Sequence, residues 1–298
     1  MGERKENMYK DAREERKEIF ENTKQLYKSN KRLIDSIENS KKGQLVIAEN
    51  DNIVSTAHHI YETSAKIVVS KKRSLEAARS YLDQKVCVLN FASATNPGGG
   101  VENGSNAQEE AICRCSTLFP CISDSKVVNQ FHYKHQAELK VGQINVLYND
   151  DCIYTPNVLI FKTDTTYPKL MLEKDWYIID VISCAAPNLR KKPSNYMNPN
   201  GGNMAVSIKA SELLNLHMKR MRRILDIAKN NKEEVVILGA FGCGAFQNSP
   251  DVVAEAMARV IKDYIYDFKV IEFAIYCSPN GKRNYDVFNR RLSRIAKK

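Results

Sequence analysis

The chain has 298 residues and a formal net charge of +10, and 43% of its residues are hydrophobic while 27% are charged. These proportions are typical of a globular protein and argue against a disordered or low-complexity chain. No apolar stretch approaches the roughly 20 residues of a membrane-spanning helix. The first ten residues lack the apolar core of a secretory signal. We therefore expect neither a membrane partner nor secretion.

The eight cysteines are spread along the chain, and several lie in apolar segments. Without a secretion signal, they indicate reduced thiols and a cytoplasmic protein. Cys113, Cys115 and Cys121 lie close together, with His132 and His135 nearby, but the chain has no CxxC pair. Because zinc sites usually need such spacing, we expect no metal.

The first 42 residues are highly charged, and apolar side chains recur in them at helical spacing between Ile19 and Ile37. This pattern predicts one or two amphipathic helices that end at Gly43. We predict two parts of the chain. Residues 1–42 form an N-terminal helical extension, and residues 43–298 form the main domain.

From residue 43 onward, short apolar runs alternate with helical patterns. The predicted strands are Leu45–Ala48, Lys66–Ser70, Val86–Phe91, Val158–Lys162, Tyr177–Ser183, Val235–Ala240 and Phe273–Cys277. The predicted helices are Ser74–Leu82, Ala107–Leu118, Ile208–Lys229, Pro250–Asp263 and Tyr285–Ile295. Continuous apolar strands that alternate with helices predict an α/β fold, with a mixed or mostly parallel sheet flanked by helices. The stretch Pro187–Asn203, rich in Asn, Pro, Gly and Lys, predicts a mobile surface loop.

Two glycine clusters each follow a predicted strand and lead into a helix. The first is NPGGG, ending at Gly100, and the second is FGCGAF, which contains Gly242 and Gly244. In open α/β sheets, ligands bind beyond the carboxyl ends of the strands, and glycines let backbone N–H groups approach a phosphate. Neither cluster is a Walker A loop or a GxGxxG loop. The pair predicts a diphosphate gripped from both sides, and tight turns without a ligand are the alternative.

Gln108, Glu109 and Glu110 follow the first glycine cluster at the start of a predicted helix. Acidic residues in a first turn often only complement the helix dipole. Next to a phosphate site, however, two anions are unfavourable unless they have a function. A carboxyl near phosphates holds its proton more tightly and suits general-acid attack on a glycosidic oxygen. Adjacent helical residues point about 100° apart, so we expect different roles for Glu109 and Glu110.

The arrangement GGG, seven residues, QEE is joined by further segments in order along the chain: CRCSTLFPC, IYTPNVLIF, AAPN and LGAFGCGAFQNSP. Together they resemble the microbial-type branch of the macrodomain-type poly(ADP-ribose) glycohydrolases, from about Ala12 to Ile275. The resemblance implies a macrodomain-like catalytic domain over residues 43–298. It also implies ADP-ribose as the ligand and hydrolysis of the glycosidic bond at C1″ of the distal ribose, with no cofactor and no metal.

The resemblance also assigns roles to residues. Glu110 matches the catalytic glutamate, which protonates the leaving oxygen and then activates water, and Glu109 matches the residue that binds ribose hydroxyls. Phe246 matches the aromatic residue that orients the distal ribose. The ligand-binding positions that it implies are Asn96, Gly98, Gly99, Gly100, Val101, Gln108, Gly242, Cys243, Gly244, Ala245 and Phe246.

The sequence departs from that family at two positions. Ser93 stands where many relatives carry Asn, and its hydroxyl is shorter, so Asn96 is the candidate to replace that contact. Asn248 replaces an acidic residue that is common after the second loop. No motif places the adenine contacts. Asn50 and Asp51 are candidates because they follow the first predicted strand.

Three functional hypotheses remain at this point. The leading one is an ADP-ribosyl glycohydrolase acting on polymer, modified protein or modified nucleic acid. A non-catalytic ADP-ribose-binding macrodomain module is the alternative, and an enzyme acting on an NAD-derived metabolite is a third. The presence of both Glu109 and Glu110 favours an enzyme, because a binding module needs no acid there.

The last seventeen residues, from Lys282 onward, carry seven basic side chains and one acidic side chain. Arg283, Arg290 and Arg294 share one face of the predicted helix. This predicts contact with a phosphate-rich partner outside the pocket, and a solvated helix face is the alternative.

Overall fold

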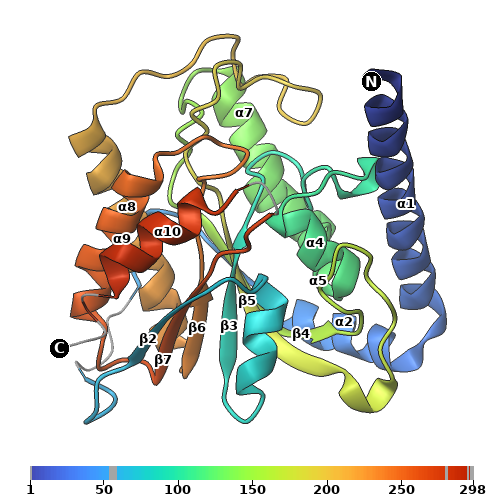
Figure 1. Cartoon of the computed structure of the whole chain (residues 1–298), viewed down its shortest axis with the longest axis horizontal. Coiled ribbons are helices and arrows are strands. Elements are labelled where there is room, and N and C mark those ends of the chain that lie inside the picture. Colours follow the sequence, from blue (N-terminus) through green and yellow to red (C-terminus); the bar gives the residue numbers. More distant parts are fainter. Residues whose placement is uncertain (1, 54–58, 279–280, 294, 296–298) are drawn as a thin grey trace.

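The computed structural model describes residues 2–53, 59–278, 281–293 and 295. Its centre is a seven-stranded mixed sheet with the strand order β1-β4-β5-β3-β6-β7-β2 (Figure 1). The strands are β1 (Leu45–Ile47), β2 (Lys66–Ser70), β3 (Val86–Phe91), β4 (Cys152–Ile160), β5 (Tyr177–Cys184), β6 (Val235–Leu238) and β7 (Val270–Ala274). The five strands from β5 to β2 run parallel, whereas β1 and β4 pair antiparallel at one edge. The predicted α/β fold with a mixed sheet is confirmed.

Helices cover both faces of this sheet (Figure 1). One face carries α8 (Ala210–Asn230), α9 (Pro250–Val260) and α10 (Arg283–Leu292). The other carries α3 (Ser74–Ala78), α4 (Gln108–Cys115), α5 (Leu118–Ile122), α6 (Ser125–Val127) and the N-terminal helices α1 (Gly2–Ser29) and α2 (Lys31–Gly43). Leu139 of α7 (Lys134–Lys140) packs instead on Ala94 and Ala185, which follow the ends of β3 and β5. Because strand side chains alternate, Cys87 and Leu89 of β3 enter the core beneath α8 and α9, and Val86 and Val88 enter the opposite core.

Two strands, β4 and β7, begin earlier in the chain than the sequence predicted, each for a physical reason. β4 begins at Cys152, six residues before the predicted start. Pro156 and Asn157 form a bulge within this continuous strand, and in the sequence they look like its beginning. Asn157 adopts φ 57°, which breaks the alternation of the sequence pattern. β7 begins three residues early, at Val270, because Glu272 lies buried in it. The carboxylate of Glu272 accepts hydrogen bonds from two hydroxyl groups on neighbouring elements, so its charge does not exclude it from the core.

The predicted helix Ala107–Leu118 is also wrong in its length. α4 ends at Cys115, and Ser116 is extended and forms a β-bridge with Ile160 before α5 begins. The helices between residues 118 and 140 were not predicted. The N-terminal extension has the expected helices, and Asn30 separates them because its side chain accepts a bond from the backbone N–H of Leu33, which starts α2.

The segment Pro187–Asn203 contains no helix or strand beyond one isolated bridge, as predicted. It is not a plain surface loop, however, because Asn188 and Asn198 within it are buried. Asn198 donates a hydrogen bond to the hydroxyl of Tyr148, and the backbone N–H of Asn188 donates to Val146. Within the described part of the chain, no helix is both long and apolar enough to span a bilayer.

Candidate active site

A cavity of about 580 Å³ opens where the parallel strands end. The residues that follow or terminate the five parallel strands all line it, represented by Arg73, Phe91, Ala186, Ala240 and Ala274. This is the place at which an open α/β sheet binds its ligand, as the strand-end rule predicts. The two glycine clusters both reach it, the first after β3 and the second after β6.

The first glycine cluster closes tightly around the two glutamates. Gly98 and Gly99 adopt φ values of 69° and 57°, a conformation that favours glycine. A Cβ atom added to Gly99 would lie 2.6 Å from Oε1 of Glu110 and 3.1 Å from Oε2 of Glu109. The backbone therefore touches both carboxyl groups at a point where any side chain would push them away.

Glu110 is fixed by backbone hydrogen bonds at both oxygens. The N–H of Gly100 donates to Oε1 and the N–H of Ala107 donates to Oε2, each at 2.9 Å. The second bond is half of a capping box, in which a glutamate in the first turn reaches back to the start of its own helix. Glu110 as a whole is 6% exposed, and it lines the cavity. Its carboxyl group therefore combines a fixed position with access to a ligand.

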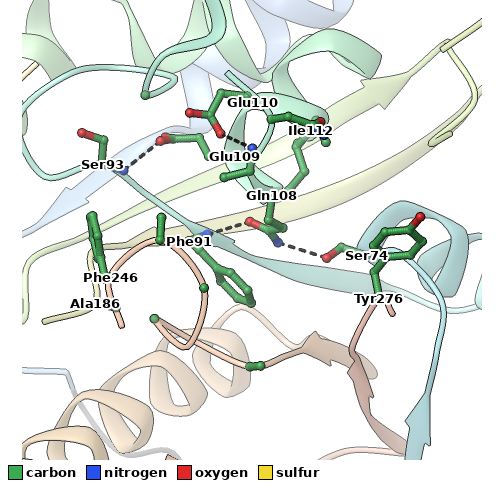
Figure 2. A pocket seen from close by; sticks show the side chains of 18 of the residues that line it. Ser74, Phe91, Ser93, Gln108, Glu109, Glu110, Ile112, Ala186, Phe246 and Tyr276 are labelled. Atoms are coloured by element: carbon green, nitrogen blue, oxygen red, sulfur yellow. Dashed lines mark hydrogen bonds between the residues drawn. The ribbon is translucent and has the colours of Figure 1, made fainter. Parts of the chain in front are cut away.

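Glu109 lies beside Glu110 and has different partners (Figure 2). Its carboxyl accepts bonds from the backbone N–H of Ser93 at 2.8 Å and from the side-chain amide of Asn90 at 3.3 Å. Burial, and then the charge of Glu110, raise the pKa of Glu109 well above its ordinary value. A carboxyl that keeps its proton can donate a hydrogen bond, so this side chain is suited to holding a sugar hydroxyl.

Gln108 supports the site from behind. Its side-chain carbonyl accepts the N–H of Phe91, and its amide donates to the hydroxyl of Ser74 (Figure 2). The same amide also donates to the carbonyl of Leu89. These bonds tie the end of β3 to the first turn of α4. The amide group is therefore already paired with protein, although Gln108 also lines the cavity.

The second glycine cluster is held from its inner side by Asn248, which is 2% exposed. Its amide donates to the carbonyls of Gly242 at 3.1 Å and Pro187 at 2.7 Å, and its oxygen lies 2.9 Å from Nε2 of His217. Burial lowers the pKa of His217 to about 4. Asn248 therefore anchors the loop and does not face the cavity, while Gly244 is exposed with open space beside it.

Phe246, Tyr148 and Arg190 form the wall next to the second glycine cluster. The ring of Phe246 lies 6.4 Å from that of Tyr148, and the guanidinium of Arg190 lies 5.4 Å from the Phe246 ring centre. Tyr148 adopts φ 56°, which is unusual for a bulky residue. Arg190 has no carboxylate within 4.0 Å among the described residues, so its charge is available to an anionic ligand.

The opposite end of the cavity contains a different group of side chains, next to the ends of β2 and β7. The guanidinium of Arg73 stacks 3.9 Å from the ring centre of Tyr276. Asp164 lies nearby, and burial raises its pKa. Among the described residues, its Oδ1 atom has no hydrogen-bond partner. Ser74 and Asn284 add polar groups to the same end.

The predicted site residues fall into two groups. Those that line the cavity are Gly99, Gln108, Glu109, Glu110, Gly242, Gly244, Ala245 and Phe246. Those that lie behind the lining are Asn96, Gly98, Gly100, Val101 and Cys243. Asn96 donates its amide to the carbonyl of Gly99, whereas Ser93 itself faces the cavity, so the expected exchange of roles between them is not found.

Asn50 and Asp51, the adenine candidates, do not line this cavity. They follow β1, the outermost strand, which β4 separates from the parallel strands. Asp51 instead closes its own turn by accepting the N–H of Ala48. The structure therefore gives no support to an adenine contact at Asn50 or Asp51, because the strand-end rule gives the edge of the sheet but not the position along it.

Tyr148, Arg190, Arg73 and Tyr276 were not predicted from the sequence. The strand-end rule, applied to the loops after β2, β5 and β7, would have found Arg73, Arg190 and Tyr276. Tyr148 precedes β4 and carries no comparable signal.

The chain matches the family described as microbial-type PARG, catalytic domain, over residues 5–163. No curated protein matches it. The poly(ADP-ribose) glycohydrolase from Thermomonospora curvata is 26% identical, with a TM-score of 0.78 over 93% of this chain and 98% of that one. The same enzyme bound to the inhibitor ADP-HPD is also 26% identical, with a TM-score of 0.76 over the same shares of the two chains. A Deinococcus radiodurans poly(ADP-ribose) glycohydrolase in complex with ADP-ribose is 24% identical, with a TM-score of 0.71 over 87% of this chain and 98% of that one, which shows a common fold.

Proposed function

Because this chain belongs to the microbial-type poly(ADP-ribose) glycohydrolase family, we propose that Glu110 is the general acid and base of its reaction. The chain binds ADP-ribose and is a glycoside hydrolase that acts on poly(ADP-ribose). The observation that supports the role of Glu110 is its fixed carboxyl at the cavity wall, held by the N–H groups of Gly100 and Ala107. Those two bonds leave the remaining lone pairs free to face a ligand.

In this proposal, Glu110 first donates a proton to the oxygen that leaves C1″ of the distal ribose. The C1″–O bond breaks as the sugar gains oxocarbenium character, and the carboxylate that remains stabilises the positive charge. The same carboxylate then takes a proton from a water molecule that attacks C1″. Glu109 holds a ribose hydroxyl and so keeps C1″ within reach of its neighbour.

The two ends of the cavity support one orientation of ADP-ribose. The distal ribose lies between Glu110 and Phe246, and the diphosphate lies between the two glycine clusters, with Arg190 supplying positive charge. The adenine lies on Tyr276, because a stacked aromatic and guanidinium pair offers a flat surface to a purine ring. Ser74 and Asn284, which line the same end of the cavity, offer polar groups to the edge of that ring.

The proposal also covers substrates other than the polymer. ADP-ribosylated protein and nucleic acid are candidate substrates beside the polymer, with the basic C-terminus as a contact for their phosphates. Arg290 and Arg291 each already face a carboxylate of α9, Asp251 at 3.4 Å and Glu255 at 3.1 Å. Arg294, Lys297 and Lys298, which belong to the same prediction, lie outside the described residues. A cytoplasmic location stays a prediction, supported by eight free thiols.

The experiment is a release assay with three substrates: ADP-ribose polymer, mono-ADP-ribosylated protein and ADP-ribosylated DNA. We expect free ADP-ribose from the polymer with the wild-type chain and none with Glu110→Gln. Calorimetry with ADP-ribose runs in parallel on both proteins. Tight binding without release from any of the three substrates would support the alternative, a non-catalytic ADP-ribose-binding module.

A further inference from the structure

We propose that the N-terminal helix α1 is part of the catalytic apparatus, and that Arg13 and Arg16 are positioning residues for Glu110. The inference rests on the proposed role of Glu110 and extends it to a helix that does not line the cavity. Its basis is a continuous series of hydrogen bonds from α1, through the loop after the glycine cluster, to the carboxyl of Glu110.

The series begins at the short helix η2 (Val101–Asn103), which directly follows the glycine cluster. Nε of Arg13 donates to the carbonyl of Asn103 at 2.6 Å, and Nε of Arg16 donates to the carbonyl of Gly104 at 2.7 Å. Lys24, two turns further along α1, lies 3.5 Å from the carboxylate of Glu102. Three basic side chains of one helix thus hold three consecutive residues of one loop.

The contact is close enough to dictate a residue type. Gly104 has φ 69°, and a Cβ atom added to it would lie 2.2 Å from the backbone oxygen of Arg13. No side chain fits between the loop and the helix. Glycine is therefore required at position 104 both by its positive φ and by the closeness of α1, and Gly104 does not line the cavity.

The loop transmits this position to Glu110 through one residue. The backbone N–H groups of Asn103 and Ser105 both donate to the carbonyl of Gly100 at 3.0 Å. The N–H of Gly100 in turn donates to Oε1 of Glu110 at 2.9 Å. A shift of residues 103–105 would move Gly100 and so one of the two bonds that fix the proposed acid.

The helix itself is firmly anchored, so it can serve as the fixed point. Nζ of Lys162, which is 2% exposed, donates to the carbonyl of Ile19 and to the side chain of Asn22. Thr23 donates to the carbonyl of Arg114, and Phe20 is fully buried against Phe119. These anchoring contacts lie C-terminal to Arg16 in α1 and do not involve either arginine. Replacing the two arginines should therefore release the loop and leave the helix in place.

The test compares Arg16→Gln and the double variant Arg13→Gln/Arg16→Gln with the wild-type chain. We expect kcat on ADP-ribose polymer to fall about tenfold in the single variant and up to about a hundredfold in the double variant, since a displacement of about 1 Å can cost that much. The Kd for free ADP-ribose should stay within about threefold, because no described residue of α1 lines the cavity. Arg16→Lys, which keeps a long, positively charged donor where glutamine is shorter and neutral, should recover part of the rate.

Arg32→Gln is the matched control. Arg32 belongs to the same extension and donates to a backbone carbonyl, that of Glu173, at 2.5 Å, while it stacks on Trp176. Its loop does not line the cavity, so kcat should stay at the wild-type value even where the melting temperature falls. All rates are taken per folded molecule, measured by circular dichroism.

The inference is overturned if the double variant keeps the wild-type kcat, or if Arg32→Gln lowers kcat as much as it does. Glu110→Gln, assayed alongside, separates this failure from that of the proposed function. An inactive Glu110→Gln with fully active arginine variants removes only the role of α1. An active Glu110→Gln removes the role of Glu110 and this inference with it.

Discussion

The two glycine loops of this protein look alike in sequence but are built for opposite reasons. In the first, Gly98–Gly100, every added Cβ would strike protein at 2.8 Å or less: a phenylalanine ring, the carboxyl of Glu110 or a serine hydroxyl. In the second, a Cβ added to Gly242 would strike Asn248 and Ala186, whereas one added to Gly244 would point into open space. The first loop needs glycine because side chains of the protein pack directly against its backbone. Gly244 in the second leaves room in front of it.

This difference explains how the tasks are divided across the cavity. The first loop is held from outside by α1 and from inside by two glutamates, so it fixes chemical groups with little freedom. The second loop is anchored at one buried asparagine and presents exposed backbone to the ligand. We therefore expect changes in the first loop to affect turnover and changes in the second to affect binding.

The largest effect should follow from Glu110→Gln. Glutamine has nearly the same shape and can still accept the N–H of Gly100 or Ala107, but it cannot donate the proton. General acid–base catalysis is worth roughly 10²–10⁴-fold, so kcat should fall by at least that range while the Kd for ADP-ribose changes little. Single-turnover kinetics and calorimetry measure the two quantities. Hydrolysis within a few-fold of the wild-type rate would show that another group is the acid.

The comparison of the loops is tested directly by Gly99→Ala and Gly244→Ala. At Gly99, the added methyl group would lie 2.6 Å from the Glu110 carboxyl, and φ 57° is unfavourable for alanine. We expect kcat to fall by more than tenfold and the protein to lose about 1–3 kcal/mol of stability. At Gly244 we expect unchanged stability and, at most, weaker binding of ADP-ribose. Equal losses of kcat in the two variants would contradict the division of tasks.

A smaller effect is expected on the pH dependence of stability, and it comes from His217, the partner of Asn248 behind the second loop. His217 has its ordinary pKa of 6.5 in the unfolded chain, whereas burial lowers it to about 4 in the fold. Between these values the unfolded chain binds more protons. The stability that His217 contributes is therefore complete above pH 6.5 and is lost as the pH falls toward 4. By pH 5 the loss should reach about 2 kcal/mol.

Urea unfolding of the wild type and His217→Gln at pH 7 and pH 5 measures this contribution. The variant should lose less stability between the two pH values, since all other groups titrate in both proteins. An identical loss in both would mean that His217 is not responsible.

The smallest effect should come from a region outside both loops, the basic C-terminus. Replacing Arg283, Arg290, Arg291 and Arg294 with Gln should weaken binding to long ADP-ribose polymer and leave the affinity for free ADP-ribose nearly unchanged. Each phosphate contact that is lost should reduce the salt slope by about 0.7–0.9, by analogy with nucleic acids. Binding at two salt concentrations measures this slope. Equal slopes in wild type and variant would show that these arginines do not contact the polymer and would leave Arg290 and Arg291 as partners of α9 alone.

The sequence predicted those parts of the site whose signal is local. The two glycine clusters, the QEE triplet and five of the seven strands stand out because composition and spacing within a few residues define them. The missed residues, such as Arg190 and Tyr276, act only where separate loops meet over the sheet. Their function depends on contacts between distant segments. The strand-end rule points to the loops that carry these residues, but no pattern within the chain shows which side chains of those loops meet.

Burial of charge was the second obstacle to prediction. Glu272 lies within β7 and Lys162 lies beneath α1, and each looks like a surface residue until its hydrogen-bond partners are known. Gln108 shows the reverse case, because a position suited to a ligand is already paired with protein. In all three, the decisive fact is the partner, which the fold supplies.

The pairing of β2 with β7 joins residues 66–70 to residues 270–274, about two hundred positions later. During synthesis, β2 therefore remains without β7, its neighbour in the described sheet, until about two hundred further residues have emerged. Contacts between such distant segments fold slowly, because the entropy of closing a long loop is lost before the contact forms. The end of the cavity that contains Arg73 and Tyr276 should thus be the last part of the enzyme to mature, after the loops that surround Glu110.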